Sequence, residues 1–202
     1  PVNARGRIRL AERDERFLQL ESAVNLTSSE FLAVLIPSAI KDSSDPEKKV
    51  TSTLLQPQGW TGAKVETDAG IVRAFFRTGP AGKTSAEGFS TDAERFAAET
   101  DKSGAVRRVF LRGGTIEGEG IALSGGAPLA VSASYSADGV EFETESEAGT
   151  TLSLRFDSEP ADVILDGATF RNWKYDKASR TIRIPVPAGH AVGKLLTRKE
   201  SK

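Results

Sequence analysis

Short runs in which apolar and polar residues alternate, separated by turn residues, constrain this chain most strongly. The alternation covers residues 129–135, 140–145, 152–156 and 182–186, and Asp138-Gly139 supplies a hairpin signal between the first two runs. Successive side chains of a strand point to opposite faces of a sheet, so each run predicts a half-buried strand. Short strands with turn signals about every ten residues are typical of an antiparallel sandwich.

The first half of the chain carries signals of the same kind. Strands are predicted over residues 5–10, 17–20, 50–55, 63–66, 71–77 and 105–112. Asp68 and Gly70 supply turn chemistry for a hairpin, and Gly113-Gly114 ends the last of these strands. We therefore predict an all-β protein, a single antiparallel β-sandwich domain over residues 1–202 with little or no helix.

Residues 89–100 are the one place where a helix competes with a strand. Thr91 and Glu94 fit a capping box, and Ala93 and Phe96 lie at helical spacing. The stretch is short for an isolated helix and is bracketed by predicted strands. We predict a strand here.

Two segments predict loops. Residues 41–49 are polar, contain a proline and show no periodicity. Residues 79–88, GPAGKTSAEG, predict a flexible loop, and they lack the complete GxxxxGK[ST] pattern of a phosphate-binding loop.

One apolar run differs from the alternating strands. Phe31 to Ile36 are all apolar and stop at Pro37, and the run is too short to span a membrane. It predicts a strand buried on both faces, at the centre of the core. Burying each of its larger side chains stabilises the fold by about 1.5–3 kcal/mol.

The composition excludes several kinds of chemistry. The 27 basic and 28 acidic residues nearly balance, which argues against a nucleic-acid binder. The absence of cysteine excludes disulfides, and the single histidine excludes a histidine-cluster metal site, so we expect no metal and no cofactor. No membrane span and no signal peptide are predicted. Because the chain begins at Pro1 and lacks methionine, we expect it to be a piece of a longer protein.

The order of several segments resembles the C-terminal β-sandwich region of heparinase II/III-like polysaccharide lyases. The similarity extends over nearly the whole chain and rests on strand and turn segments. These segments are Gly6-Arg7-Ile8, Glu30 to Pro37, Gly62 to Val65, Ser90 to Ala93, Gly113 to Thr115 and Val163 to Gly167.

The resemblance implies a parent enzyme with an N-terminal α/α toroid and β-sandwich layers that cleaves uronate-containing polysaccharides by β-elimination. It implies that the catalytic toroid and sheet domain of the same protein is the partner of this chain, with acidic polysaccharide as a second ligand. It also implies export to the periplasm or the cell exterior. Nothing in this chain matches the family's catalytic segments, so no catalytic residue is assigned.

Uronate β-elimination needs a base, a group that neutralises the carboxylate and an acid for the leaving oxygen. The candidates here are His190, Tyr135, Tyr175 and the arginines. We expect His190 to lie exposed in a turn before the last strand, without a catalytic role. Tyr135 lies within a strand pattern, which favours packing in the core or at its rim.

A cluster of aromatic and basic residues is the local sequence most suited to a glycan. Arg171, Trp173 and Tyr175 lie within a few residues of each other, and exposed aromatic rings stack on sugars while bases meet carboxylates. The alternative is that the rings pack on one end of the sandwich with the bases extended to solvent. Trp60, close to Pro57, carries the same two interpretations.

Four glutamates at period two, Glu141, Glu143, Glu145 and Glu147, predict a solvated strand face that discourages edge pairing. A calcium site is disfavoured because the flanking loop chemistry is missing. The bases at positions 107, 108 and 112 are candidates for pairing with these acids across strands.

These observations favour a non-catalytic domain that braces the catalytic domain of a polysaccharide lyase or lines its cleft. The alternative is a free-standing carbohydrate-binding or cell-surface adhesion module. A third interpretation is a structural domain without a ligand.

Overall fold

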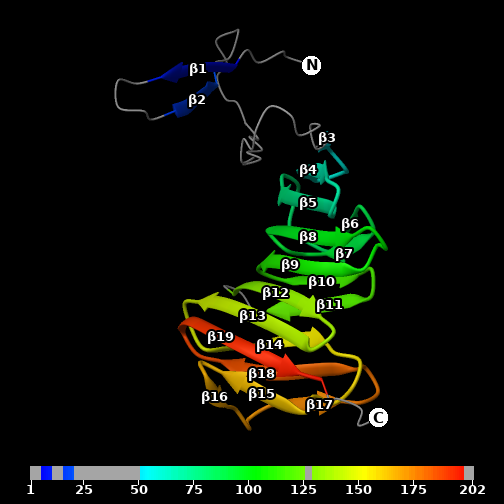
Figure 1. Cartoon of the computed structure of the whole chain (residues 1–202), viewed down its shortest axis with the longest axis vertical. Helices are drawn as coiled ribbons and strands as arrows, with labels where there is room; N and C mark the ends of the chain where they lie inside the picture. Colours follow the sequence, from blue (N-terminus) through cyan, green and yellow to red (C-terminus); the bar gives the residue numbers. More distant parts are fainter. Residues whose placement is uncertain (1–5, 11–15, 21–50, 126–128, 198–202) are drawn as a thin grey trace, which may run out of the picture. The chain divides into compact units, whose positions relative to one another are not determined.

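A computed structural model describes residues 6–10, 16–20, 51–125 and 129–197. The chain divides into two compact units, Pro1–Pro37 and Ser38–Lys202. In the first unit, β1 (Gly6–Leu10) and β2 (Arg16–Leu20) form an antiparallel hairpin, as predicted (Figure 1). The predicted central strand at residues 31–36 and the predicted loop at 41–49 lie outside the described residues.

The second unit contains two antiparallel sheets (Figure 1). The larger sheet has ten strands in the order β16-β15-β19-β13-β12-β9-β8-β5-β4-β3. Their bounds are β3 (Thr51–Leu55), β4 (Trp60–Glu66), β5 (Gly70–Arg77), β8 (Arg95–Asp101), β9 (Val106–Arg112), β12 (Ala130–Ser136), β13 (Gly139–Ser146), β15 (Asp162–Leu165), β16 (Ala168–Thr169) and β19 (Gly189–Leu196).

The smaller sheet has seven strands in the order β17-β18-β14-β11-β10-β7-β6. Their bounds are β6 (Thr84–Ala86), β7 (Phe89–Thr91), β10 (Thr115–Gly118), β11 (Ile121–Gly125), β14 (Thr150–Arg155), β17 (Lys174–Asp176) and β18 (Thr181–Val186). The described residues form strands and connecting turns, which confirms the all-β sandwich. None of them belongs to a helix long and apolar enough to cross a membrane. The prediction of one domain over residues 1–202 stays a prediction.

The contested residues 89–100 form β7 and most of β8, as predicted, although residues 92–94 connect the two strands and are not part of either. Thr91, the predicted helix cap, instead donates its hydroxyl to the Thr115 carbonyl at 2.6 Å and accepts the Ala93 N–H at 3.1 Å. The predicted loop at residues 79–88 contains a strand, so this prediction was partly wrong. β6 and β7 pair through a two-residue turn, Glu87-Gly88, in which both residues have positive φ.

The two sheets pack on one apolar core. Its largest fully buried side chains include the rings of Trp60, Phe75, Phe89 and Phe96, with Trp60 edge-on to Phe96 at 5.5 Å between ring centroids. Phe75 stacks on Phe96 at 4.9 Å. Such aromatic pairs contribute about 0.5–1.5 kcal/mol each beyond the burial of their area.

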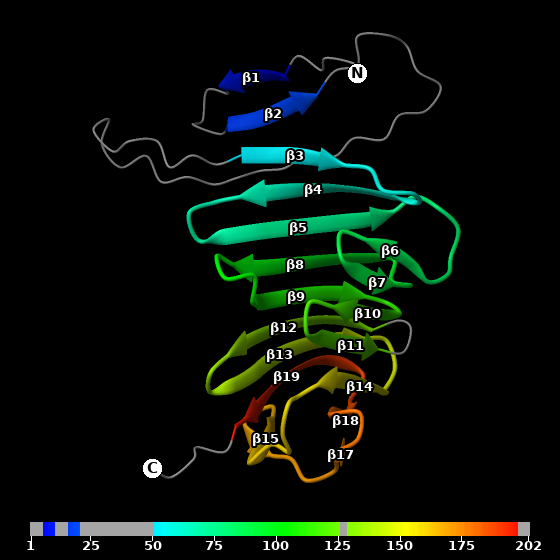
Figure 2. The same cartoon turned by 90° about the vertical axis from the view of Figure 1, so that its right-hand side faces the viewer.

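The smaller sheet covers only part of the larger one. In Figure 2, β6, β7, β10 and β11 lie over one end of β5, β8 and β9, while the β4–β5 and β8–β9 hairpins lie at the opposite end. We call this opposite end of the second unit the hairpin end. There the inward face of the larger sheet carries charged residues, among them Lys64, Glu66 and Arg73, where core residues would otherwise stand.

The outward face of the larger sheet carries the predicted glutamate row. Glu141 accepts from Lys194 at 2.7 Å and Glu143 contacts His190 at 2.6 Å, both across the β13–β19 pair. The prediction that Arg107, Arg108 and Arg112 pair with these glutamates was wrong. In the structure they pair with Asp101, Glu99 and Glu94, because β9 lies beside β8 and not beside β13.

Candidate functional site

The predicted glycan cluster lies at and just before β17. Trp173 and Tyr175 are half-buried and pack against the core, whereas Arg171 is exposed. The Tyr175 hydroxyl donates to the Phe156 carbonyl at 3.0 Å. Much of the aromatic surface is therefore engaged in packing, and Arg171 is the member of the cluster most open to solvent.

Trp60 is placed apart from this cluster, on β4. Its side chain is 2% exposed, and its indole N–H donates to the Thr84 hydroxyl at 2.8 Å. The Arg77 guanidinium covers the ring at 4.4 Å from its centroid, and Arg77 Nε donates to the Ala93 carbonyl at 2.7 Å. A ring so enclosed has no free face for a sugar, so the glycan-contact proposal does not include Trp60.

The acid–base candidates of β-elimination are not brought together. His190 lies in β19, not in a turn as predicted, and its side chain is exposed on the outward face of the sheet. Its hydrogen bond with Glu143 raises the pKa of His190 above the ordinary 6.5. Tyr135 points inward from β12, so the two side chains lie on opposite faces of the same sheet.

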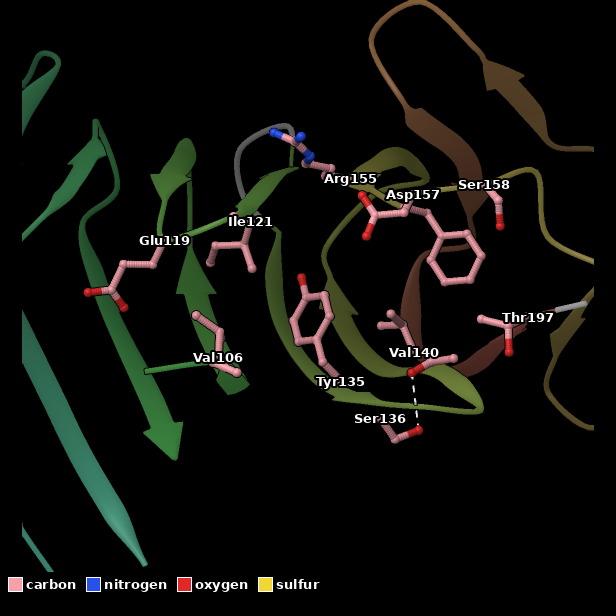
Figure 3. Close-up of a pocket in the computed structure, with 14 residues that line it drawn as sticks. Val106, Glu119, Ile121, Tyr135, Ser136, Val140, Arg155, Asp157, Ser158 and Thr197 are labelled. Carbon is pink, nitrogen blue, oxygen red and sulfur yellow. Dashed lines mark hydrogen bonds between the residues drawn. The ribbon is translucent and has the colours of Figure 1, made fainter. Parts of the chain in front are cut away.

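Tyr135 lines a hollow of 360 Å³ between the two sheets, which we call the Tyr135 hollow. Figure 3 shows its hydroxyl directed between Ile121, Arg155 and Asp157. The hydroxyl is buried and has no hydrogen-bond partner in the described part of the chain, and burial raises the pKa of Tyr135 to about 12. The phenol therefore stays protonated near neutral pH, which makes it a hydrogen-bond donor and not a base.

The position of Tyr135 follows from the strand pattern. Val131 and Ala133, which precede it on the inward face of β12, are fully buried in the core. Tyr135 comes next on that face, close to the β12–β13 turn, where the Ser136 hydroxyl donates to the Gly139 carbonyl at 3.2 Å (Figure 3). The ring thus lies where the core ends and borders the hollow, with its hydroxyl buried.

A second hollow of 290 Å³ lies at the β4–β5 and β8–β9 hairpins, and we call it the Arg73 hollow. The Arg73 side chain is only 15% exposed, and its Nε and Nη1 atoms are buried without a hydrogen-bond partner among the described residues. The Glu119 carboxylate lies 3.7 Å from Nη1, too far for a hydrogen bond. Buried donors without partners are rare in proteins, so the Arg73 guanidinium is a candidate for a functional group.

Two other acids that line the Arg73 hollow, Glu66 and Asp101, have close partners, and the exposed Lys102 also lines it. Glu66 pairs with Lys64 at 2.6 Å. Asp101 accepts from the Ser103 hydroxyl and amide and from the Ala105 amide, and it pairs with Arg107. The hydrogen bond from the Ser103 hydroxyl, followed by that from Arg107, lowers the pKa of Asp101 to about 2. The carboxylates of Glu66 on β4 and Asp101 on β8 therefore already have ionic or hydrogen-bonding partners.

Glu119 lines both hollows. It stands with Gly120 in the two-residue turn between β10 and β11, and both residues have positive φ, 49° and 82°. Turns of this type favour Asn, Asp or Gly at the first position, so a glutamate there carries a conformational cost. This turn conformation places the Glu119 carboxylate at the boundary of the two hollows, and the side chain is 27% exposed.

Arg73 and Glu119 were not predicted as site residues. A signal for Arg73 exists, because the inward positions of β5 run Ile71, Arg73, Phe75 and place a cation in an apolar row. Glu119 gives no such signal, since only the folded arrangement of the turn brings it to Arg73.

Within the described ranges, no group of three or more His, Cys, Asp or Glu residues could hold a metal ion. No family model matches this chain, and no curated protein matches it.

Proposed function

We propose that this chain is a non-catalytic β-sandwich domain of a heparinase II/III-like polysaccharide lyase and that it lines the cleft in which the parent enzyme holds its polysaccharide. The observation that carries this proposal is the pair of neighbouring hollows at the hairpin end, both of which Glu119 lines. They present Tyr135 and Arg73, whose buried donors have no partner within the described ranges. Polar groups converging in a concave site are what ligand binding requires.

The chemistry of the hollows favours binding over turnover. Removal of the C5 proton of a uronate needs a base close to the sugar, but Tyr135 is held protonated by its raised pKa and His190 lies on the other face of the sheet. The resemblance in segment order supports a lyase as the parent. It also supports export to the periplasm or the cell exterior and a catalytic toroid domain as the partner.

The proposal is tested by incubating the chain with alginate, heparin and heparan sulfate. Lyase activity is followed by the absorbance of the unsaturated product, and binding by retarded migration in gels that contain each polysaccharide. We expect retardation in at least one gel and no product. Product formation by the chain alone contradicts the non-catalytic role, and unretarded migration in every gel contradicts the binding role.

A free-standing carbohydrate-binding module is the second candidate. One observation favours it, namely that the described residues lining the two hollows all belong to the second unit. If retardation is instead lost in Arg171→Ala or Trp173→Ala while folding survives, the glycan contact lies at the cluster around β17.

A further inference from the structure

We infer that Lys102 and Arg155, one at each hollow, are the residues that recognise the carboxylate groups of the polysaccharide. Lys102 lines the Arg73 hollow, and Arg155 lines the Tyr135 hollow. Both side chains are exposed, and neither forms an ion pair within the described ranges. The assignment rests on the proposed function and names the groups of its ligand that are held.

The other charged residues that line the two hollows each face a partner of opposite charge. These pairs are Glu66–Lys64, Asp101–Arg107, Asp157–Arg180 and Glu119–Arg73. The acids of two neighbouring turns, Asp68 and Asp138, line neither hollow. Lys102 and Arg155 therefore remain as the surplus charges of the lining, and both are positive.

Lys102 is carried by a turn whose backbone is held in place. Its neighbour Asp101 accepts from the amides of Ser103 and Ala105, and the Asp101 N–H donates to the Ala105 carbonyl at 2.9 Å. Because the Asp101 carboxylate is engaged with these donors and with Arg107, it is not free to neutralise Lys102. The ammonium group thus offers its donors to a ligand anion from a fixed point of the backbone.

Arg155 ends β14, where strand pairing and packing fix its backbone. It lies opposite Thr181 of β18, and the next residue, Phe156, is buried and donates its N–H to the Arg180 carbonyl at 2.8 Å. Figure 3 shows Arg155 on the side of the hollow toward which the Tyr135 hydroxyl points. A guanidinium presents a planar fork of donors that matches both oxygens of a carboxylate.

The placement of one cation at each hollow favours an oligosaccharide over a single sugar. Glu119 lines both hollows, so the two cations border neighbouring parts of one surface. An oligosaccharide with several uronates can contact both cations, and its second contact then forms within the complex at a high effective concentration. A uronate monosaccharide has one carboxylate and gains no such second contact.

The test is a calorimetric titration of the whole chain with tetrasaccharides prepared from alginate and heparan sulfate, each in native and carboxyl-reduced form. For a saccharide that binds, Lys102→Gln and Arg155→Gln should each weaken binding about threefold or more. Carboxyl reduction should weaken it at least as much, and so should added salt, which screens exposed charge pairs. Lys177→Gln and Arg108→Gln remove the same charges from exposed side chains that line neither hollow, and these matched controls should bind as the unmodified chain does.

The native saccharides show whether a failure concerns this assignment or the proposed function. If a native saccharide binds, the assignment is overturned when either variant or the carboxyl-reduced form binds as tightly. It is also overturned when removal of the sulfates of heparan sulfate abolishes binding and carboxyl reduction does not. In these cases binding of the native form preserves the proposed function, whereas failure of every saccharide to bind overturns both.

Urea unfolding separates a lost contact from a lost fold. Each variant should unfold at the midpoint of the unmodified chain, because each replaces an exposed side chain. The carboxyl-reduced saccharides are measured against the unmodified chain, so a change of fold cannot account for their result.

Discussion

At the scale of single residues, the polar groups of the hairpin end are placed where an ordinary sandwich would continue its core. Arg73 lies within the inward row of β5, between Ile71 and Phe75, and Tyr135 is the last inward residue of β12. Both leave buried donors without a partner within the described ranges. An unsatisfied buried donor costs about 1–3 kcal/mol. Local costs of this kind are a mark of functional sites, which is why we place the ligand there.

His190 gives a prediction on pH. Its hydrogen bond with Glu143 raises its pKa, so the protonated ring is favoured in the folded chain. The contribution to stability is full below the ordinary pKa of about 6.5 and is lost as the pH rises through the raised value. NMR titration of this single histidine should give a pKa above 6.5 that falls back toward 6.5 in Glu143→Gln. An unchanged pKa in Glu143→Gln contradicts the pairing, and Glu147→Gln serves as the control.

At the scale of elements, β19 and β13 pack closely where the Phe142 ring of β13 lies against Gly193 of β19. A Cβ at Gly193 would collide with the Phe142 ring across the strand pair. We expect Gly193→Ala to destabilise the fold by about 1–3 kcal/mol through overpacking. Val192→Ala, next on the same strand and 49% exposed, should change stability by less than about 0.5 kcal/mol. Urea unfolding measures both, and equal effects of the two substitutions would contradict this packing.

The strands themselves could be predicted because alternation and turn residues are local signals. The alternation in residues 129–135 and 140–145 appears in the structure as β12 and β13, joined at Asp138-Gly139. The partners of Arg107 and Arg108 could not be predicted, since they depend on which strands are neighbours in the sheet. β6 was missed because three residues between glycines carry too little pattern to stand out from a loop.

At the scale of the whole molecule, the near balance of 27 basic and 28 acidic residues gives no general attraction for a polyanion. Binding to an acidic polysaccharide must then come from local fit. In our proposal, the two hollows of the second unit, both lined by Glu119, supply such a fit. The predicted cluster at Arg171, Trp173 and Tyr175 remains the competing location.

The central claim is that the hairpin end binds a saccharide without cleaving it. An NMR titration of the isotope-labelled chain with a uronate-containing tetrasaccharide tests this directly, because protein amide shifts and signals of an unsaturated product are read in one sample. We predict shift changes concentrated at Arg73, Glu119 and Tyr135 and their neighbours, with the saccharide intact. Shift changes confined to residues 171–175, or the appearance of unsaturated product, would contradict it.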